Sequence, residues 1–583
     1  GSANNMDTRW SLKDAYKKYT RDQDKTASPE QTVENVRQRF ELLNLEILKE
    51  TRRIDNGRLD IPVYFSVCGS DAKALTGTAK QMGKGATPQQ AEASAVMELV
   101  ERFSFYSFAQ NTDNFVQGTH KQMGDMAMDF SDIAKSVHDA SEDLDAARRV
   151  FENMEFKWAH GFNLTKREPV LVPFEWFFAI NEFNGTSAGN CVEEALCQGI
   201  CEVVERHVCD FVCKDRPELP GIDPDSANDP MVRQMLSKYH DSGIKIYASD
   251  FTLNTGIPTV GVLAWDPETF PEKSEIVWTA GTAPDPQKAF SRALSETAQL
   301  GGDFNSGSNY VASGLPKLSS PDKAGFITQP SRIVGINELP DLSDVNIRVE
   351  VERCIEKLAG IGLEVIGLDT THPDLKIPAF YSIIPGARFR ERAEAASVGM
   401  FCAKLVEENN EPEKAINELA EINRILTGKY YVEFYMGKAR LESGQPGQAA
   451  RHFEKALDLN PHPQDVVSIY SFIGQACKET GDYKKALEAV EKGLAYDDER
   501  SDLYNLAGFC QFKLKEHEAA IESFKQAVRQ NPSSAIDYAN LAVNYREVGD
   551  METAVGCFRI ALDLDPELDF ARKNIEALTG QSL

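Results

Sequence analysis

The sequence predicts a mixed α/β or α+β domain over residues 9–405, followed by an all-α repeat solenoid over residues 413–583. Apolar runs typical of strands are interspersed with long helix-like segments in the first part. Two of those segments, 83–102 and 184–207, each join a Gly-rich loop to an apolar helix. Beyond residue 413 the sequence pattern changes to a regular repeat, so a second domain of different architecture is expected.

Bulk properties limit the classes of function. The chain has 583 residues, 42% hydrophobic and 26% charged, which is typical of several folded domains. Its net charge of −27 argues against nucleic-acid or membrane binding, because phosphate surfaces require clustered Lys and Arg. No segment resembles a signal peptide or a membrane span, so we expect a cytoplasmic protein. Residues 1–8 are interpreted as an expression scar and a start near Met6.

The first domain begins with two expected helices, at 12–20 and 28–48, the second with Ser28 as N-cap and Pro29 at N1. Pro286 is expected to open a later helix. Strands are expected at the apolar runs 61–69, 157–164, 168–180, 244–251, 257–265, 275–283, 363–369 and 378–384.

The C-terminal repeat is carried by a recurring alanine. Ala449, Ala486, Ala520 and Ala554 follow one another at spacings of 37, 34 and 34, and a bulky apolar residue stands four positions after each. This is the period of tetratricopeptide repeats, in which a small residue lets the two helices of a unit approach closely. We expect four to five helix pairs, with a concave surface that contacts a partner protein or a second copy of the chain.

Charged residues lie on the two apolar helices at matching positions. The first carries Ser94, Glu98, Glu101 and Arg102, and a shift of 104 residues places the last three on Glu202, Glu205 and Arg206. At about 100° per residue, Glu194, Glu202 and Glu205 share one helix face with Asn190. The helix after Pro286 carries Arg292, Glu296 and Gln299 on one face.

Carboxylates on apolar helices are costly unless cations meet them. Glu98, Glu101, Glu194, Glu202 and Glu205 exceed what single arginines neutralise, whereas Mg²⁺ ions bridging a polyphosphate would balance them. Gly-rich loops before helices offer N–H groups to phosphates, although neither loop is a Walker A motif. The alternative is a solvated face of ion pairs, which the apolar intervening residues disfavour.

These motifs resemble the YcaO family. The resemblance rests on GKGATPQQAEASAVMELVER, NGTSAGNCVEEALCQGICEVVER and GTAPDPQKAFSRALSETAQ, and it covers roughly residues 20–400. It implies that ATP and Mg²⁺ bind between the carboxylate helices, with Glu202, Glu205 and Arg292 in catalytic roles. The region KTASPEQTVENV resembles the family's N-terminal nucleotide contact, which implies adenosine-side contacts from Lys25 and Thr32.

The resemblance also implies an activity. Family members use ATP to activate a peptide amide oxygen, giving a thioamide or an azoline, or they support methylthiolation of a ribosomal protein. Ring-forming members often end in a Pro-rich tail, whereas this chain continues through Arg388, Arg390 and Arg392 into repeats. That favours the tail-less branch and a partner that is TfuA-like, E1-like or a methylthiotransferase.

Two other functions stay open from the sequence. The repeats could make the chain a scaffold protein in which ATP is only a structural or regulatory ligand. A thiol- or metal-dependent enzyme could instead be built on the five clustered cysteines, although their spacing matches no zinc or iron–sulfur pattern and packing explains them more simply. These are Cys191, Cys197, Cys201, Cys209 and Cys213.

Overall fold

The computed structural model describes residues 10–312, 314–390 and 396–583. It contains two compact units. The first comprises Gly1–His138, Glu152–Ser308 and Ala312–Arg392, and the second comprises Asp139–Phe151, Asn309–Val311 and Ala393–Leu583. The boundary expected after residue 405 therefore falls inside α14 (Val398–Asn409), which packs against the following helices of the second unit.

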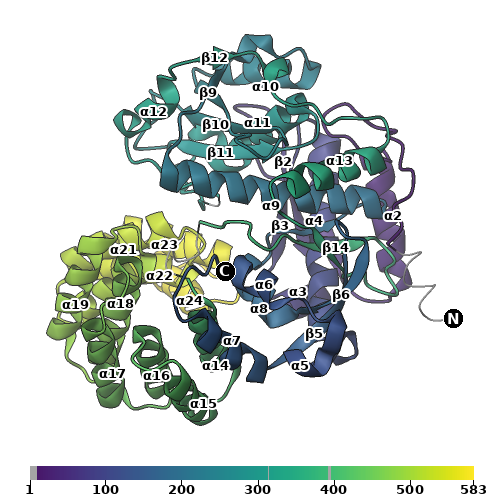
Figure 1. The fold of residues 1–583 in the computed structure, drawn as a ribbon. Coiled ribbons are helices and arrows are strands. Elements are labelled where there is room, and N and C mark those ends of the chain that lie inside the picture. Colours follow the sequence, from purple (N-terminus) through teal and green to yellow (C-terminus); the bar gives the residue numbers. More distant parts are fainter. Residues whose placement is uncertain (1–9, 313, 391–395) are drawn as a thin grey trace. The chain divides into compact units, whose positions relative to one another are not determined.

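The first unit contains three β-sheets, and several of their strands are labelled in Figure 1. The antiparallel three-stranded sheet has the order β1-β2-β3, with bounds Leu48–Arg53, Val63–Cys68 and Lys80–Lys84. A five-stranded sheet has the order β11-β10-β9-β8-β12, with bounds Val277–Thr282, Thr259–Trp265, Lys245–Asp250, Gly221–Ile222 and Ile333–Val334. The third sheet has the order β4-β5-β13-β14-β7 with β6 beside β5, with bounds Phe115–Thr119, Glu155–Asn163, Ile366–Asp369, Ala379–Ile383, Thr186–Ala188 and Glu168–Pro173.

Helices pack on and between these sheets. Their bounds are α2 (Pro29–Leu42), α3 (Ser70–Thr76), α4 (Pro88–Gln110), α5 (His120–Met123), α6 (Phe130–Ser136), α8 (Phe174–Asn181), α9 (Val192–Asp215), α10 (Pro230–Asp241), α11 (Pro286–Gly301), α12 (Gly325–Thr328) and α13 (Ile347–Gly360). Helix α7 (Leu144–Asn153) lies mostly in the second unit. No described helix combines the length and apolar character needed to span a bilayer.

Each sheet delivers one long helix through a short turn: β3 leads to α4, β7 to α9 and β11 to α11. Glycines let strand and helix approach. A Cβ added at Gly83 would lie 2.0 Å from the backbone nitrogen of Ala95, and one at Gly281 would lie 2.4 Å from the carbonyl oxygen of Ala289. Because no larger side chain fits, these glycines hold each helix directly against its strand.

Three sequence expectations about helices and strands are wrong. The helix expected over 28–48 ends at Leu42, and Leu48 begins strand β1 instead. Residues 12–20 form no helix; this segment instead exchanges main-chain hydrogen bonds with the segment around Asn346, 3.0 Å from Lys17 N to Val345 O and 2.8 Å from Ile347 N to Ala15 O. The strand expected over 168–180 ends at Pro173, and its aromatic second half is helix α8. A short apolar run does not distinguish a buried helix from a strand, and long-range pairing overrides local propensity.

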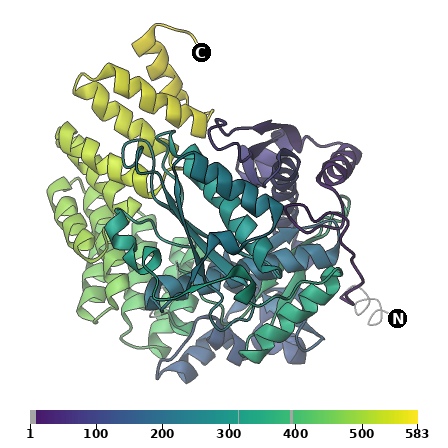
Figure 2. The same ribbon diagram turned by 90° about the horizontal axis from the view of Figure 1, so that it is seen from above.

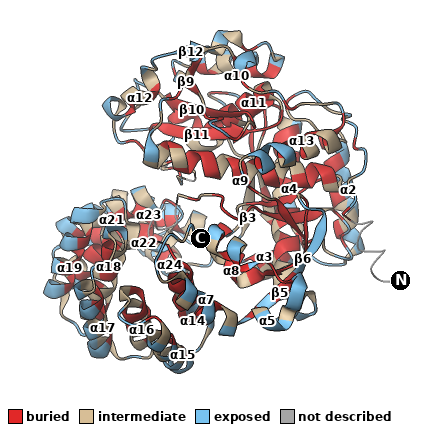
Figure 3. Cartoon of the chain, viewed as in Figure 1, coloured by how far each residue is buried: buried red, intermediate tan, exposed pale blue. Residues whose placement is uncertain are grey.

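Other expectations are confirmed in detail. Ser28 caps α2 in a capping box with Gln31, and Pro286 opens α11 with Asp285 as its N-cap. Both carboxylate-bearing helices are longer than expected, because the aromatic run after Arg102 continues α4 to Gln110 and α9 continues to Asp215. The buried faces of these helices are red in Figure 3.

The second unit is a helical array, shown in green to yellow in Figures 1 and 2. Antiparallel pairs follow one another, and each recurring alanine (449, 486, 520 and 554) lies fully buried on the second helix of its pair. The bounds are α15 (Pro412–Ile425), α16 (Tyr430–Glu442), α17 (Pro446–Asp458), α18 (Pro463–Glu479), α19 (Tyr483–Tyr496), α20 (Ser501–Lys513), α21 (His517–Gln530), α22 (Ala535–Glu547), α23 (Met551–Leu564) and α24 (Asp569–Thr579). The expected repeat solenoid is confirmed.

A buried carboxyl connects the helix before this array to its first pair. Glu407 on α14 is 2% exposed, and its carboxylate lies 3.5 Å from Lys438 Nζ on α16. Burial, together with the neighbouring Glu442 carboxyl, raises the pKa of Glu407 to about 8, while Lys438 opposes the shift. In the folded chain this carboxyl therefore keeps a proton that the unfolded chain has already lost.

We predict that Gly281→Ala strongly destabilises the first unit, because its Cβ would overlap the α11 backbone. Overpacking of this kind costs about 1–3 kcal/mol or more, measurable as a lower midpoint of thermal or urea unfolding. The matched control is Gly360→Ala at the end of α13, where an added Cβ meets nothing within 4 Å. Equal stability of the two variants would contradict the close strand–helix contact.

A second prediction concerns pH. The stabilisation from protonated Glu407 is complete below about pH 4.5 and is lost as the pH rises through about 8. Gln cannot ionise, so the melting temperature of Glu407→Gln should rise relative to wild type as the pH increases across this window. Melting curves by circular dichroism test this, with exposed Glu408→Gln as the control. A difference that does not vary with pH would overturn it.

Candidate functional site

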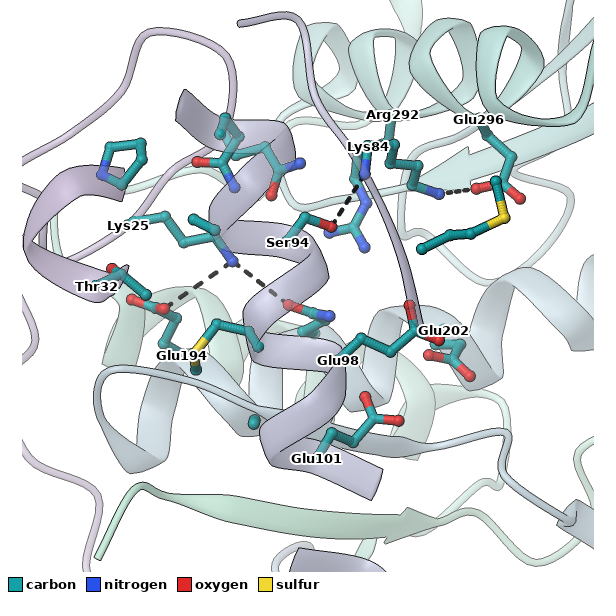
Figure 4. Close-up of a pocket in the computed structure, with 18 of the residues that line it drawn as sticks. Lys25, Thr32, Lys84, Ser94, Glu98, Glu101, Glu194, Glu202, Arg292 and Glu296 are labelled. Atoms are coloured by element: carbon teal, nitrogen blue, oxygen red, sulfur yellow. Dashed lines mark hydrogen bonds and ion pairs between the residues drawn. The ribbon is translucent and has the colours of Figure 1, made fainter. Parts of the chain in front are cut away.

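The three helices α4, α9 and α11 meet at one cavity of about 250 Å³. The N-terminal segment before α2 closes one side of it. Every residue that the sequence assigns to the site lines this cavity: Lys25, Thr32, Ser94, Glu98, Glu101, Arg102, Asn190, Glu194, Glu202, Glu205, Arg206, Arg292, Glu296 and Gln299. Figure 4 shows how ten of the lining side chains are arranged.

One side of the cavity is organised around Glu194. Its carboxylate accepts hydrogen bonds from the Thr26 N–H at 3.0 Å and hydroxyl at 3.1 Å, and from the Asn190 side chain at 2.9 Å. Lys25 Nζ lies 4.0 Å from Glu194 Oε1 and donates to Gln198 Oε1 at 3.4 Å. These contacts attach the N-terminal segment to α9, and Figure 4 shows the ion pair between Lys25 and Glu194 as a dashed line.

Thr32 contacts the same side from α2. Its hydroxyl lies 3.0 Å from Asn190 Oδ1, and it also lies 3.1 Å from the Ser28 carbonyl oxygen one turn earlier. The capped start of α2 is therefore joined to the start of α9 by a single side-chain hydrogen bond. Lys25 and Thr32, far from α9 in sequence, become neighbours of Asn190 and Glu194 only through the fold.

The other side gathers carboxylates. Glu98 and Glu101 lie one turn apart on α4, and Glu202 approaches them from α9 (Figure 4). Removal from bulk water raises the pKa of Glu98 to about 7, with Arg102 opposing the shift and Glu202 adding to it. Burial also raises the pKa of Glu101 and of Glu202 above their usual values. An added cation would relieve this repulsion.

Several direct contacts partly compensate those charges. Glu101 accepts from the Thr186 hydroxyl at 2.8 Å and lies 3.2 Å from Arg102 Nε. The Arg102 guanidinium stacks over the Phe183 ring, 3.9 Å from its centroid. Glu202 accepts from the Gly185 N–H at 3.3 Å, so the loop before α9 also contacts this carboxylate.

Sequence reasoning missed Lys84, which lies between the two glycines that precede α4. Its ammonium forms an ion pair with Glu296 on α11, joining two of the three strand–helix units. Its backbone N–H donates to Ser94 Oγ at 3.2 Å. Burial, with Arg292 adding repulsion, lowers the pKa of Lys84 to about 8. The sequence feature that could have identified Lys84 is a single cation between two glycines at the end of an expected strand.

The lining residues suit a metal-bound polyphosphate in their charges. The cavity wall carries six carboxylates, of Glu98, Glu101, Glu194, Glu202, Glu205 and Glu296. It also carries five cations, of Lys25, Lys84, Arg102, Arg206 and Arg292. Gln90, another lining residue that the sequence did not indicate, has a buried Oε1 without a hydrogen-bond partner. In the described chain no three His, Cys, Asp or Glu side chains are already arranged to hold a metal ion.

The clustered cysteines lie in surroundings that disfavour the thiolate form. All are free; Cys201 and Cys209 are buried, and the other three are half-buried. Burial raises the pKa of Cys191 to about 11 and of Cys213 to about 12. Reactive cysteines have a lowered pKa, so these environments fit packing better than nucleophilic chemistry.

Comparison with protein families agrees with this geometry. A profile described as YcaO cyclodehydratase, ATP- and Mg²⁺-binding, matches residues 82–388, more than half of the 583 residues. A tetratricopeptide-repeat profile matches residues 440–506 and 478–545. The family that the sequence motifs imply is therefore confirmed, and ATP and Mg²⁺ are the ligands in the description of that family.

Individual proteins are similar over parts of the chain. An uncharacterized protein of Methanothermobacter thermautotrophicus is 27% identical over 379 residues, which are 61% of this chain and 93% of that protein. The Escherichia coli ribosomal protein S12 methylthiotransferase accessory factor YcaO is 27% identical over 238 residues, 37% of this chain and 40% of that one.

One solved structure shares the fold. A heterocyclase solved with substrate and cofactor is 23% identical, has a TM-score of 0.52, and matches 67% of this chain and 56% of its own length. The strand–helix units that form the cavity fall almost entirely within the residues matched by the YcaO profile. On these grounds the chain belongs to the YcaO family, with tetratricopeptide repeats following the family domain.

Proposed function

We propose that this chain binds ATP with Mg²⁺ in the cavity between α4, α9 and α11 and uses it to activate a peptide amide. The observation that carries the proposal is the convergence on one cavity of carboxylates from α4 and α9 with cations from the N-terminal segment, the β3–α4 region, α9 and α11. The raised pKa of Glu98, Glu101 and Glu202 means that these groups hold their charge at a cost that divalent cations would offset.

The residues divide into three roles in this proposal. Lys25 and Thr32, at the Glu194 side, contact the adenosine end. Glu98, Glu101, Glu194, Glu202 and Glu205 hold the magnesium ions, with Glu202 and Glu205 closest to the chemistry. Cations that line the same cavity, above all Arg292, stabilise charge on the transferred phosphoryl group. Ser94, Arg102, Asn190, Arg206, Glu296 and Gln299 complete the nucleotide site.

ATP supplies a phosphoryl group that turns the amide oxygen, a poor leaving group, into phosphate, a good one. The amide oxygen attacks the γ-phosphorus while the bond to ADP breaks; a nucleophile then adds to the amide carbon and phosphate departs. Sulfide would give a thioamide, and a neighbouring Cys, Ser or Thr side chain would give an azoline. The chain's own contribution is positioning and charge compensation.

The repeats add a place for a protein partner. The partner classes that fit this activity are a TfuA-like or E1-like protein and a methylthiotransferase. The similarity to an accessory factor of a ribosomal protein methylthiotransferase supports the third class. Tetratricopeptide arrays bind proteins on their concave surface, and self-association of the array is a further possibility for the same surface. If the chain bound no nucleotide, a scaffold function carried by the repeats would be the remaining alternative.

The first test is Glu202→Gln. In wild type, Mg²⁺ should strengthen ATP binding at least about tenfold, because without it the carboxylates and the triphosphate repel each other. The variant should lose that gain and lower ATP hydrolysis by about 100-fold, as removal of one charge-stabilising group typically does. Isothermal titration calorimetry with and without Mg²⁺, and phosphate release, measure both effects.

Glu92→Gln is the matched control for this test. Glu92 lies on the same helix as Glu98 but hydrogen-bonds Thr51 on β1 and does not line the cavity. It should retain affinity, magnesium dependence and hydrolysis. Wild-type hydrolysis in folded Glu202→Gln would refute the assignment of the metal site.

The second test separates the structural and functional roles of Lys84. Lys84→Met should lower both thermal stability and ATP hydrolysis, because it leaves the Glu296 carboxylate without its ion-pair partner. Adding Glu296→Gln should recover stability, since no unpaired charge then remains, but not hydrolysis. A double variant that recovers both would show that Lys84 acts only as the partner of Glu296.

A further inference from the structure

The five-stranded sheet has an interrupted strand. β8 pairs with β9 for only two residues, Gly221 with Ser249 and Ile222 with Ala248. The chain then leaves the sheet at Pro224, where an Asx turn, with Asp225 N–H donating to Asp223 Oδ1 at 3.0 Å, starts a short 3₁₀ helix. Among the described residues, no strand pairs with the remainder of β9, from Lys245 to Tyr247, on this side.

A groove of about 890 Å³ lies where β8 would have continued. It runs between the exposed part of β9, the 3₁₀ helix that follows β8, and α10; the labels β9, β12 and α10 locate this region in Figure 1. The residues that line it include Pro224, Arg233, Leu236, Ile244, Lys245 and Ile246. None of them lines the carboxylate cavity.

The main chain of Ile246 faces this groove. Asp250 N–H donates to the Pro220 carbonyl on the β8 side, and alternation along a strand therefore turns Ala248 and Ile246 to the same side. Lys245 and Tyr247 face β10 instead, in the register that pairs Lys245 with Trp265. If β8 continued in the same register, Pro224 would stand opposite Ile246. Proline has no N–H to donate to the Ile246 carbonyl.

The side chains indicate what kind of strand fits. Leu236, Ile244 and Ile246 provide apolar contact area beside the free edge. Arg233 and Lys245 are exposed cations on the rim, against one carboxylate, Asp225, in a chain whose net charge is −27. The local charge therefore favours an acidic segment.

We propose that this groove binds an extended, acidic segment of the peptide or protein that the enzyme modifies, which pairs with β9 as an added strand. The proposal rests on the proposed function for the identity of the occupant, but not for the binding itself. Ile246 would exchange two main-chain hydrogen bonds with the segment, and alternate side chains would contact Leu236 and the cationic rim.

The position of the groove determines the distance between the bound segment and the reacting amide. It lies at the Val277 end of the sheet, whereas Thr282, at the other end of β11, lines the carboxylate cavity. Five residues along a strand and three strand intervals across the sheet correspond to roughly 20 Å. The bound segment and the reacting amide would then be at least about six residues apart in an extended substrate.

The test uses the full chain and a displayed random library of peptides about twelve residues long as the probe. Selected peptides are synthesised with a fluorophore and titrated by anisotropy against wild type, Ile246→Pro and Ile246→Val. Proline removes the N–H that faces the groove and leaves the β10 ladder intact, so binding should weaken about tenfold or more. Valine keeps the N–H and should bind like wild type.

A second variant, Arg233→Glu/Lys245→Glu, should lose acidic peptides and shift the selected sequences towards basic ones. Two results would overturn the proposal. Either Ile246→Pro weakens the binding of none of the selected peptides, or the selected peptides are not enriched in acidic residues. Magnesium–ATP affinity is measured on the same samples and should be unchanged by all three variants. Failure to bind ATP in wild type would instead overturn the proposed function, whatever the peptide result.

Discussion

The cost of keeping carboxylates away from water governs the first unit. Glu98, Glu101 and Glu202 project from apolar helices into one cavity, where burial raises the pKa of each. Buried carboxylates of this kind are costly unless cations face them, and the proposed metal-bound nucleotide would add such cations.

The strand–helix glycine contacts make that arrangement possible. Gly83 and Gly281 bring α4 and α11 directly against their strands, and Gly189 does the same for α9 with a Cβ distance of only 2.6 Å to the Ala195 nitrogen. Three sheets thus fix three helix starts, and the charged residues on each helix follow from its fixed start. Lys84 and Glu296 then join two of these units by an ion pair.

The two surfaces outside the cavity for which binding is proposed, the repeat array and the β9 edge, have different physical origins. The repeats bury their alanines at each helix crossing and leave polar helix faces outside. The β9 edge arises because Pro224 ends β8 after two residues and leaves main-chain groups of Ile246 without a strand partner. One surface comes from repetition in sequence and the other from an interruption in a sheet.

The sequence by itself determined what depends on local periodicity: the helix faces that carry Glu98, Glu194 and Arg292, the capping of α2, and the repeat array. It also carried the family resemblance. It failed for residues 12–20, which pair with the segment at Asn346, and for the aromatic helix after Pro173, because contacts distant in sequence decided both. Only the tertiary structure showed that Lys84 lines the cavity and that part of the β9 edge is unpaired. Both depend on which strands lie side by side. The periodicity of one segment does not reveal which segments will neighbour it in space.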